Sequence, residues 1–312
     1  MIPWKSGKIT IDLGYDCNHK CVYCYNKHIK VPKNLSFSSD QLIHLMEYVN
    51  NIVGNKYLHY QITGGEPTIY PELLDALLNK YITLSHHTSL GINTNLTLDI
   101  SMLIDTYLKR TFTINVSLPS TNKEHFNKIT GSLLTYDKLM NNLLKLIQSG
   151  FQPSDISINI IVVDINESSI GTTVSDLIYV GLKNIYITNP LGYEINVDFK
   201  NLYNDVEKFA LNNGVFLKGN RVCTAACLPG VSSVSNACVD RSHFILKLLP
   251  NGQVKPCSCG FTQPVIGYLS DGFENLLKAR DEYMNQKEKP FIECNNCRLW
   301  NISCMGACLP KQ

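Results

Sequence analysis

The chain has 312 residues, of which 44% are hydrophobic and 17% are charged, so it can bury a core of barrel size. Its formal net charge is only +2, with no run of like charges and no basic stripe, which argues against nucleic acid as a partner. The chain start lacks the apolar region of an export signal, and no segment reaches the roughly 18 apolar residues of a membrane span, so we expect a cytoplasmic protein.

The first predicted element is a strand at residues 8–14, where apolar and polar side chains alternate. Three cysteines, Cys17, Cys21 and Cys24, follow this strand. Thiolates are ligands of zinc and of iron-sulfur clusters, and a closed structural site of either kind takes four of them. Only three are local here. The segment therefore predicts either a zinc knuckle or redox thiol cluster, or a metal centre with one open position for an exogenous ligand.

Strand and helix patterns then alternate along the first two thirds of the chain. Helical spacing at residues 41–49 follows possible capping side chains at residues 36–40. Further strands are expected at residues 57–63, 88–93, 111–118, 155–163 and 184–188, and further helices at residues 71–83, 98–108, 136–149, 168–180 and 201–213. Such alternation predicts a parallel sheet with right-handed crossovers, in a barrel or in a doubly wound arrangement.

Small and polar residues follow the second, third and fourth predicted strands. They are Gly64, Gly65, Glu66, Pro67, Asn95 and Ser117. Catalytic loops of α/β barrels lie at these strand ends, where a glycine pair lets backbone approach a ligand and a carboxylate can accept from an ammonium group. Taken alone, the glycine pair is also compatible with a tight turn, and Ser117 with a backbone cap.

Nine of the twelve cysteines lie between residues 223 and 308. In a chain without an export signal this crowding favours metal ligands over disulfides. Residues 250–252 predict a hairpin turn between strands at residues 244–249 and 253–255, which would bring Cys238 and Cys257 together. A zinc ribbon is an alternative for the last four cysteines, Cys294, Cys297, Cys304 and Cys308.

The C-x-x-x-C-x-aromatic-C spacing, with Tyr23 as the aromatic residue, resembles the signature of the radical S-adenosylmethionine (radical SAM) superfamily. One strand later, residues 64–66 resemble its GGE motif. The resemblance implies a partial (β/α)6 TIM-like barrel and a [4Fe-4S] cluster whose open iron chelates S-adenosylmethionine. In that family an electron cleaves the sulfonium, and a 5'-deoxyadenosyl radical abstracts a hydrogen from the substrate.

The same resemblance implies roles for individual residues. The three clustered cysteines would bind the [4Fe-4S] cluster, and the GGE motif with Pro67 would hold the methionine amino group of the cofactor. Tyr23 would line the adenine, and Ser117 resembles the residue that binds the ribose. Asn95 lies where many relatives have Thr-Asn-Gly, and Leu96 replaces the glycine.

Residues 216–312 resemble the SPASM domain, which carries one or two auxiliary [4Fe-4S] clusters, so the barrel is expected to span residues 1–215. The implied ligands are Cys238, Cys257 and Cys308 for the first auxiliary cluster, and Cys294, Cys297 and Cys304 for the second. Cys223, Cys227 and Cys259 compete for the remaining positions. Of these, Cys223 lies farthest from the matched motif and is the candidate for a catalytic hydrogen-atom donor.

We therefore expect a radical SAM oxidoreductase or maturase that crosslinks, epimerises or oxidises a ribosomal peptide. The alternatives are a dehydrogenase or epimerase of a sugar or aminocyclitol, and a non-catalytic iron-sulfur or zinc-binding protein. Only sixteen residues precede Cys17, which is too few for an N-terminal leader-binding domain. This favours a separate leader-peptide-binding protein, a maturase that needs none, or a small-molecule dehydrogenase or epimerase. A reductant such as flavodoxin or ferredoxin would supply the electron, and neither nucleic acid nor a membrane is an expected partner.

Overall fold

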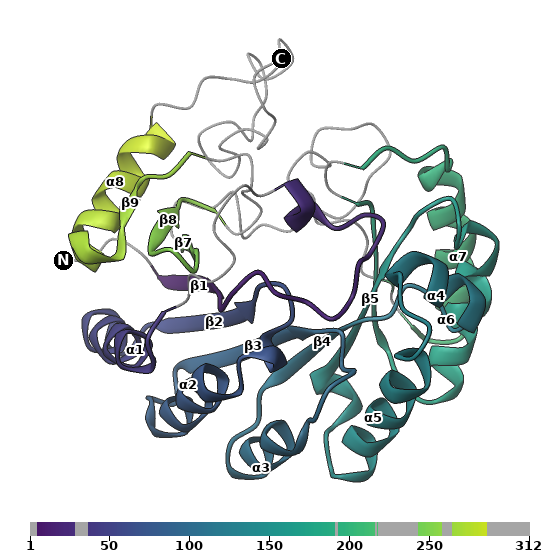
Figure 1. Cartoon of the computed structure of the whole chain (residues 1–312), viewed down its shortest axis with the longest axis horizontal. Helices are drawn as coiled ribbons and strands as arrows, with labels where there is room; N and C mark the ends of the chain where they lie inside the picture. Colours follow the sequence, from purple (N-terminus) through teal and green to yellow (C-terminus); the bar gives the residue numbers. More distant parts are fainter. Residues whose placement is uncertain are drawn as a thin grey trace.

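The computed structural model describes residues 5–28, 37–190, 193–215, 217, 243–257 and 264–285, which form a curved sheet with helices along its outer side (Figure 1). The strand order is β6-β5-β4-β3-β2-β1-β7-β8-β9. The first six strands of the chain pair in parallel: β1 (Ser6–Asp12), β2 (Tyr57–Thr63), β3 (Thr88–Thr94), β4 (Thr113–Ser117), β5 (Ile156–Ile161) and β6 (Asn184–Thr188). In these residues β6 and β9 remain unpaired with each other, so the sheet is the predicted partial barrel and is not closed.

Helices connect the parallel strands, because parallel neighbours need a long crossover. They are α1 (Ser39–Val53), α2 (Pro71–Thr83), α3 (Ser101–Lys109), α4 (Lys123–Thr130), α5 (Tyr136–Gln148) and α6 (Ile170–Tyr179), and α7 (Phe199–Asn212) follows β6. All but α4 were predicted from the sequence to within a few residues.

Side chains on each strand alternate between two environments. On β1, Ile9 and Ile11 are fully buried in the core between the sheet and the helices, whereas Thr10 and Asp12 face the inner side of the curved sheet. The same alternation on the other strands places Leu58, Ile62, Leu90, Ile92, Ile114, Val116, Ile158 and Ile187 in the outer core. The inner side is consequently lined by the polar half of each strand.

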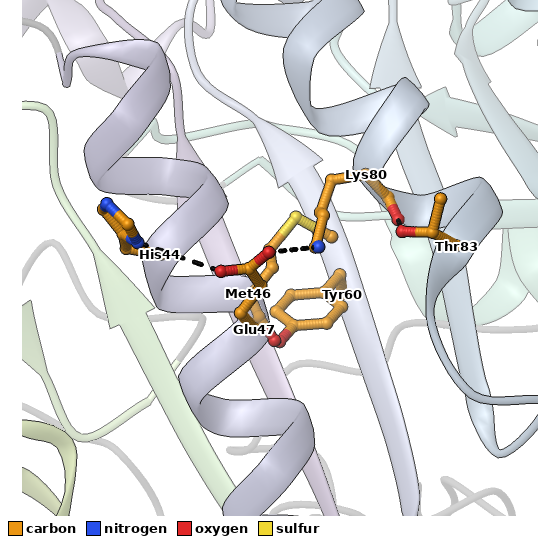
Figure 2. Close-up of polar contacts among 6 residues, drawn as sticks. All are labelled: His44, Met46, Glu47, Tyr60, Lys80 and Thr83. Atoms are coloured by element: carbon orange, nitrogen blue, oxygen red, sulfur yellow. Dashed lines mark hydrogen bonds and ion pairs between the residues drawn. The ribbon is translucent and has the colours of Figure 1, made fainter.

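The packing of α1 and α2 on β2 shows how the outer layer is held (Figure 2). A capping box between Ser38 and Gln41 begins α1, as the capping side chains in the sequence predict. The hydroxyl of the fully buried Tyr60 donates to the carbonyl of Met46 at 3.3 Å, joining β2 to α1. Lys80 of α2 donates to the carboxylate of Glu47 of α1, but such partly exposed ion pairs contribute little. Apolar burial therefore provides most of this packing.

The sheet continues into the cysteine-rich third of the sequence. Strand β7 (His243–Leu248) pairs in parallel with β1, and β8 (Gln253–Lys255) returns as the predicted hairpin, followed by β9 (Gly267–Tyr268) and α8 (Phe273–Asn285). Phe244 of β7 lies against Gly7, where a Cβ atom would come within 2.0 Å of its ring. The division at residues 215 and 216 stays a prediction, and one sheet spans both sides of it.

Two helices, α4 and α8, were missed in the sequence. α4 is short and mainly polar, with Phe126 and Ile129 as its buried apolar residues, so its periodicity is weak. Its boundaries carried a signal nevertheless: Asn122 caps the start, and Gly131 ends the helix with φ +64°. None of the helices in the described ranges is long and apolar enough to cross a membrane.

Candidate cluster and cofactor site

The residues singled out in the sequence converge on one edge of the sheet. The cysteine loop follows β1, the glycine pair follows β2, Asn95 follows β3 and Ser117 ends β4. These four strands are adjacent and parallel, so their carboxyl ends lie side by side. Ligand sites of α/β folds form at this edge.

Cys17 is exposed, whereas Cys21 and Cys24 are partly buried, and none of the three is in a disulfide. Burial raises the pKa of Cys21 to about 12, and the charges of its two neighbouring thiols add to this effect. Burial also raises the pKa of Cys17. Such a site becomes ionised only when a strongly cationic group displaces the protons, which is how thiol ligands bind a metal centre.

No three His, Cys, Asp or Glu side chains within the described ranges are arranged to hold a single metal ion. A four-iron cluster makes a different demand, because each of its thiolate ligands binds a different iron. The charges of Cys17 and Cys24 act on the thiol of Cys21, and that of Cys24 acts on Cys17, so the three side chains share one site. Their number and chemistry therefore fit a cluster with one open iron.

The cysteine loop is anchored on α4 and on the segment that leads into α5. The backbone N–H groups of Lys20 and Val22 donate to the carbonyls of Thr130 and Ile129 at 2.8 and 2.9 Å. His19 lies between Cys17 and Lys20 in the sequence. Its side chain is buried, and its Nε2 atom lies 2.9 Å from the hydroxyl of Thr135. Burial lowers the pKa of His19 to about 4, so this side chain is neutral near pH 7. The helix that the sequence missed thus supports the cysteines.

The glycine pair lies directly against the backbone of the cysteine loop. Gly65 donates to the carbonyl of Gly14, and Glu66 donates to that of Asp16, both at 2.8 Å. A Cβ atom on Gly64 would lie 2.6 Å from the Gly14 oxygen, and one on Gly65 would lie 2.1 Å from the Asp16 oxygen. Gly64 also has φ +140°, which disfavours other residues. Only glycine fits at these two positions.

The side chain of Glu66 lies against the end of β3, with only 1% of its surface exposed. Its carboxylate accepts hydrogen bonds from Thr68 and Thr94 on Oε1, and from the backbone N–H of Asn95 on Oε2 at 2.6 Å. Burial raises the pKa of Glu66, and these hydrogen bonds act to lower it. Because protein groups occupy both oxygens, the role of this carboxylate toward an ammonium group stays a prediction.

A closed ring of side-chain hydrogen bonds lies beside Cys17. Asn95 Nδ2 donates to Asn18 Oδ1 at 2.7 Å, and Asn18 Nδ2 donates to Thr97 Oγ1 at 2.8 Å. The Thr97 hydroxyl donates to Asn95 Oδ1 at 2.7 Å and completes the ring. Asn18 and Thr97 were not singled out in the sequence. The signal that the sequence offered was the position of Asn18 between two of the cysteines.

The other predicted site residues lie as follows. Tyr23 is partly buried beside Cys21, and burial raises the pKa of its hydroxyl well above the usual value. Pro67 is buried, and Ser117 pairs with Asn159 of β5 at the end of β4. Cys257 is buried just after β8. The remaining predicted cysteines lie outside the described residues: Cys223, Cys227, Cys238, Cys259, Cys294, Cys297, Cys304 and Cys308.

A charged pair on the inner face was also missed. Lys247 Nζ of β7 lies 3.0 Å from Asp12 Oδ2 at the end of β1, and both side chains are buried. Burial raises the pKa of Asp12, whereas the nearby charge of Lys247 lowers it. Strand alternation alone placed Asp12 on the inner face. The pairing needed the long connection from β1 to β7, which the sequence does not reveal.

This chain is similar to known enzymes in sequence and to solved structures in fold. GTP 3',8-cyclase of Rippkaea orientalis is 28% identical over 167 residues, covering 52% of this chain and 50% of that enzyme, so the chain spans half of this relative. Streptococcus suis SuiB bound to precursor peptide SuiA superposes with a TM-score of 0.73 at 17% identity, covering 96% of this chain and 71% of SuiB.

The structure of anSMEcpe with bound AdoMet and the Kp18Cys peptide gives a TM-score of 0.71 at 18% identity, over 97% of this chain and 89% of that one. At such low identity both solved structures show a common fold. The family model of the radical SAM superfamily matches residues 11–177, which is more than half of the chain. Since that span includes the three clustered cysteines and the glycine pair against them, the chain belongs to the radical SAM superfamily.

Proposed function

We propose that this chain abstracts a hydrogen atom from a peptide, with Cys17, Cys21 and Cys24 as the ligands of its [4Fe-4S] cluster. Membership of the superfamily implies such a cluster, which supplies the electron that cleaves bound S-adenosylmethionine to a 5'-deoxyadenosyl radical. The observation that carries the proposal is the convergence of three thiols and a close-packed glycine pair on adjacent strand ends. Tyr23, Asn95 and Ser117 border the same edge.

Within this site the protein's own residues act by positioning. The backbone of Gly64 and Gly65 forms a surface without side chains next to the cysteine loop, which lets a bound molecule approach the main chain. Glu66 and Asn95 join the ends of β2 and β3 through one short hydrogen bond. The backbone N–H groups of Gly65 and Glu66 hold the cysteine loop against these strand ends, and preorganisation of this kind lowers the cost of binding.

The inner face of the sheet supports a peptide as the substrate class. Strand alternation places Gln61, Asn93, Asn115 and Asn159 there, on four strands. Gln61 Nε2 donates to Asn93 Oδ1 at 2.9 Å. Carboxamides offer the same donors and acceptors as peptide groups, so this surface is suited to a neutral chain with many hydrogen-bonding groups. The two solved neighbours with bound peptides point the same way.

A reaction on a nucleoside triphosphate is the second candidate, because the curated relative is named GTP 3',8-cyclase. A triphosphate needs several convergent cationic donors. By strand alternation the described inner face offers Lys8, Lys247 and Lys255, and Lys247 lies against Asp12. This charge is small for a triphosphate, so we favour the peptide.

The proposal extends to the C-terminal third as a SPASM domain with one or two auxiliary clusters and Cys223 as a hydrogen-atom donor. A flavodoxin or ferredoxin would reduce the enzyme, and a separate protein would present the leader of the peptide. We place the enzyme in the cytosol, where thiols stay reduced. In a variant that lacks the first three cysteines, we expect about eight irons with two auxiliary clusters or about four with one. Zinc without iron would exclude auxiliary clusters.

The central test replaces Cys17, Cys21 and Cys24 by Ala and measures 5'-deoxyadenosine formed from S-adenosylmethionine in dithionite. We expect complete loss of the product, because no ligand of the reactive cluster remains. Ser101→Ala, which changes an exposed residue at the start of α3, is the matched control and should keep full cleavage. Undiminished cleavage in the triple variant would refute the proposal.

A further inference from the structure

The amide of Asn95 is held in one orientation beside Cys17. Its Oδ1 atom accepts from the backbone N–H of Thr97 at 3.1 Å and from the Thr97 hydroxyl at 2.7 Å. Because a backbone N–H can only donate, the atom that faces Thr97 must be the oxygen. The nitrogen therefore faces Asn18 and Cys17.

The nitrogen of Asn95 has two hydrogens and two partners. One partner is Asn18 Oδ1 at 2.7 Å, and the other is Cys17 Sγ at 3.8 Å. The backbone N–H of His19 approaches the same sulfur at 3.4 Å. Two N–H donors thus point at the Cys17 sulfur, one from the cysteine loop itself and one from the segment that follows β3.

The donor from β3 is rigidly placed. Asn95 is buried, with 7% of its surface exposed, and its hydrogen bonds in the ring with Asn18 and Thr97 fix the orientation of its side chain. Its backbone N–H donates to the buried carboxylate of Glu66 at 2.6 Å, which ties it to the end of β2. A donor held in this way does not have to reorient when negative charge develops on the nearby sulfur.

Hydrogen bonds to cysteine sulfurs are one of the means by which a protein sets the reduction potential of an iron-sulfur cluster. A donor stabilises the more negative, reduced form and so raises the potential. We propose that Asn95 is a positioning residue that donates to the Cys17 ligand and raises the potential of the radical-generating cluster. This inference rests on the proposed function, since it takes Cys17 as a ligand.

The test measures the midpoint potential of the reconstituted full-length enzyme by EPR-monitored titration. The signal followed is the one that changes when S-adenosylmethionine is added, since only a cluster with an open iron responds. Asn95→Leu keeps the number of side-chain heavy atoms and removes the donor. Asn95→Asp keeps the shape and the acceptor for Thr97 but places negative charge near the sulfur. We expect the midpoint to fall in both variants, and further in the Asp variant.

Two comparisons make the result specific. Asn50→Asp introduces the same charge near the end of α1, away from the strand ends that carry the cysteine loop, and should leave the midpoint unchanged. Thr97→Val removes one member of the ring but keeps the Asn95 donor, so its shift should be smaller than that of Asn95→Leu. Iron content of each variant is measured in parallel, so that the midpoints of intact clusters are compared.

An unchanged midpoint in Asn95→Asp at full iron content would overturn the inference. Failure of Asn95→Leu to bind iron does not rescue it, because the near-isosteric Asp variant still decides. If the parent enzyme shows no signal that responds to S-adenosylmethionine, the proposed function itself has failed. A responsive signal that ignores Asn95 sinks only the inference made here.

Discussion

Leu96 adopts a backbone conformation that normally requires glycine. Its φ of +56° is the one positive value at a non-glycine position within the described ranges. The left-handed conformation costs about 1–2 kcal/mol for a residue with a Cβ atom. The side chain is fully buried in the core, and Asn142 donates to the Leu96 carbonyl at 3.0 Å. Burial of a leucine thus offsets the strain in the turn that presents Asn95.

This balance predicts an unusual order of stability at residue 96. Leu96→Ala loses the buried side chain and keeps the strain, whereas Leu96→Gly loses the same contacts and relieves the strain. We expect both to lower the free energy of unfolding by about 2–5 kcal/mol, with Gly at least as stable as Ala. Urea unfolding measures both variants. At Leu98, where φ is not positive, the Ala variant should be more stable than the Gly variant. If Leu96→Ala were also more stable than Leu96→Gly, the backbone of Leu96 would not be strained.

His59 predicts a specific loss of stability in acid. Burial, aided by the charge of Lys8, lowers its pKa to about 4 in the folded protein, whereas an unfolded histidine has a pKa near 6.5. Between these values the unfolded chain binds more protons, so stability is complete above about pH 6.5 and falls as the pH drops toward 4.

We expect His59→Gln to weaken this acid destabilisation by up to about 2–3 kcal/mol between pH 6.5 and 4, measured by chemical unfolding at each pH. His86→Gln removes an exposed histidine and is the matched control, expected to follow the parent curve. Parallel curves for the parent and His59→Gln would show that His59 is not buried as a neutral group.

Arg110 joins three elements at the opposite end of the sheet from the cysteine loop. Its guanidinium lies 4.2 Å from the ring centre of Tyr81. It donates at 2.6–2.8 Å to four carbonyls that end α2 and begin β3, those of Tyr81, Leu84, Ser85 and Thr88. A planar guanidinium can span such a set of acceptors, and an ammonium group cannot.

Arg110→Lys is therefore expected to lower the free energy of unfolding by about 2–3 kcal/mol, because buried or half-buried carbonyls lose charged donors. Lys109→Ala, at the neighbouring exposed position, should change stability by less than about 0.5 kcal/mol. Denaturant unfolding compares the two. Equal stability of parent and Arg110→Lys would mean that the four carbonyls have adequate alternative partners.

At the scale of the whole molecule, the sheet joins the two regions that the sequence separates at residues 215 and 216. Phe244, Leu246 and Leu248 of β7 belong to the same core as Ile9 and Ile11. Burying three such side chains contributes about 5–9 kcal/mol, which is comparable to the whole net stability of a typical domain. Without β7, strand β1 also becomes an edge strand beneath the cysteine loop.

A chain that ends at residue 215 should consequently fail to unfold cooperatively. Near-UV circular dichroism and thermal unfolding measure this directly. A chain that ends at residue 285 keeps every described element and serves as the control for truncation, with a cooperative transition expected. Cooperative unfolding of the 1–215 chain would establish the barrel as an independent domain and remove this role for β7.

Local chemistry determined much of what could be read from the sequence. Strands β2 and β6 have the predicted bounds, because their alternation is a property of neighbouring residues. The spacing of Cys17, Cys21 and Cys24 indicated three thiol ligands for the same reason. The hairpin of β7 and β8 followed from its turn residues, and the structure confirms it.

Only the tertiary structure decided which distant groups meet. Asn18 and Thr97 are 79 residues apart, and their ring with Asn95 forms because parallel strands bring their carboxyl ends together. The carboxylate of Glu66 has the chemistry of a ligand-binding group, yet it is buried and accepts hydrogen bonds from Thr68, Thr94 and Asn95. The sequence by itself determined most of the helices and strands and indicated the chemical class of the site. The pairing of strands, a non-local property, decided which polar groups lie together at the strand ends and which hydrogen bonds they make.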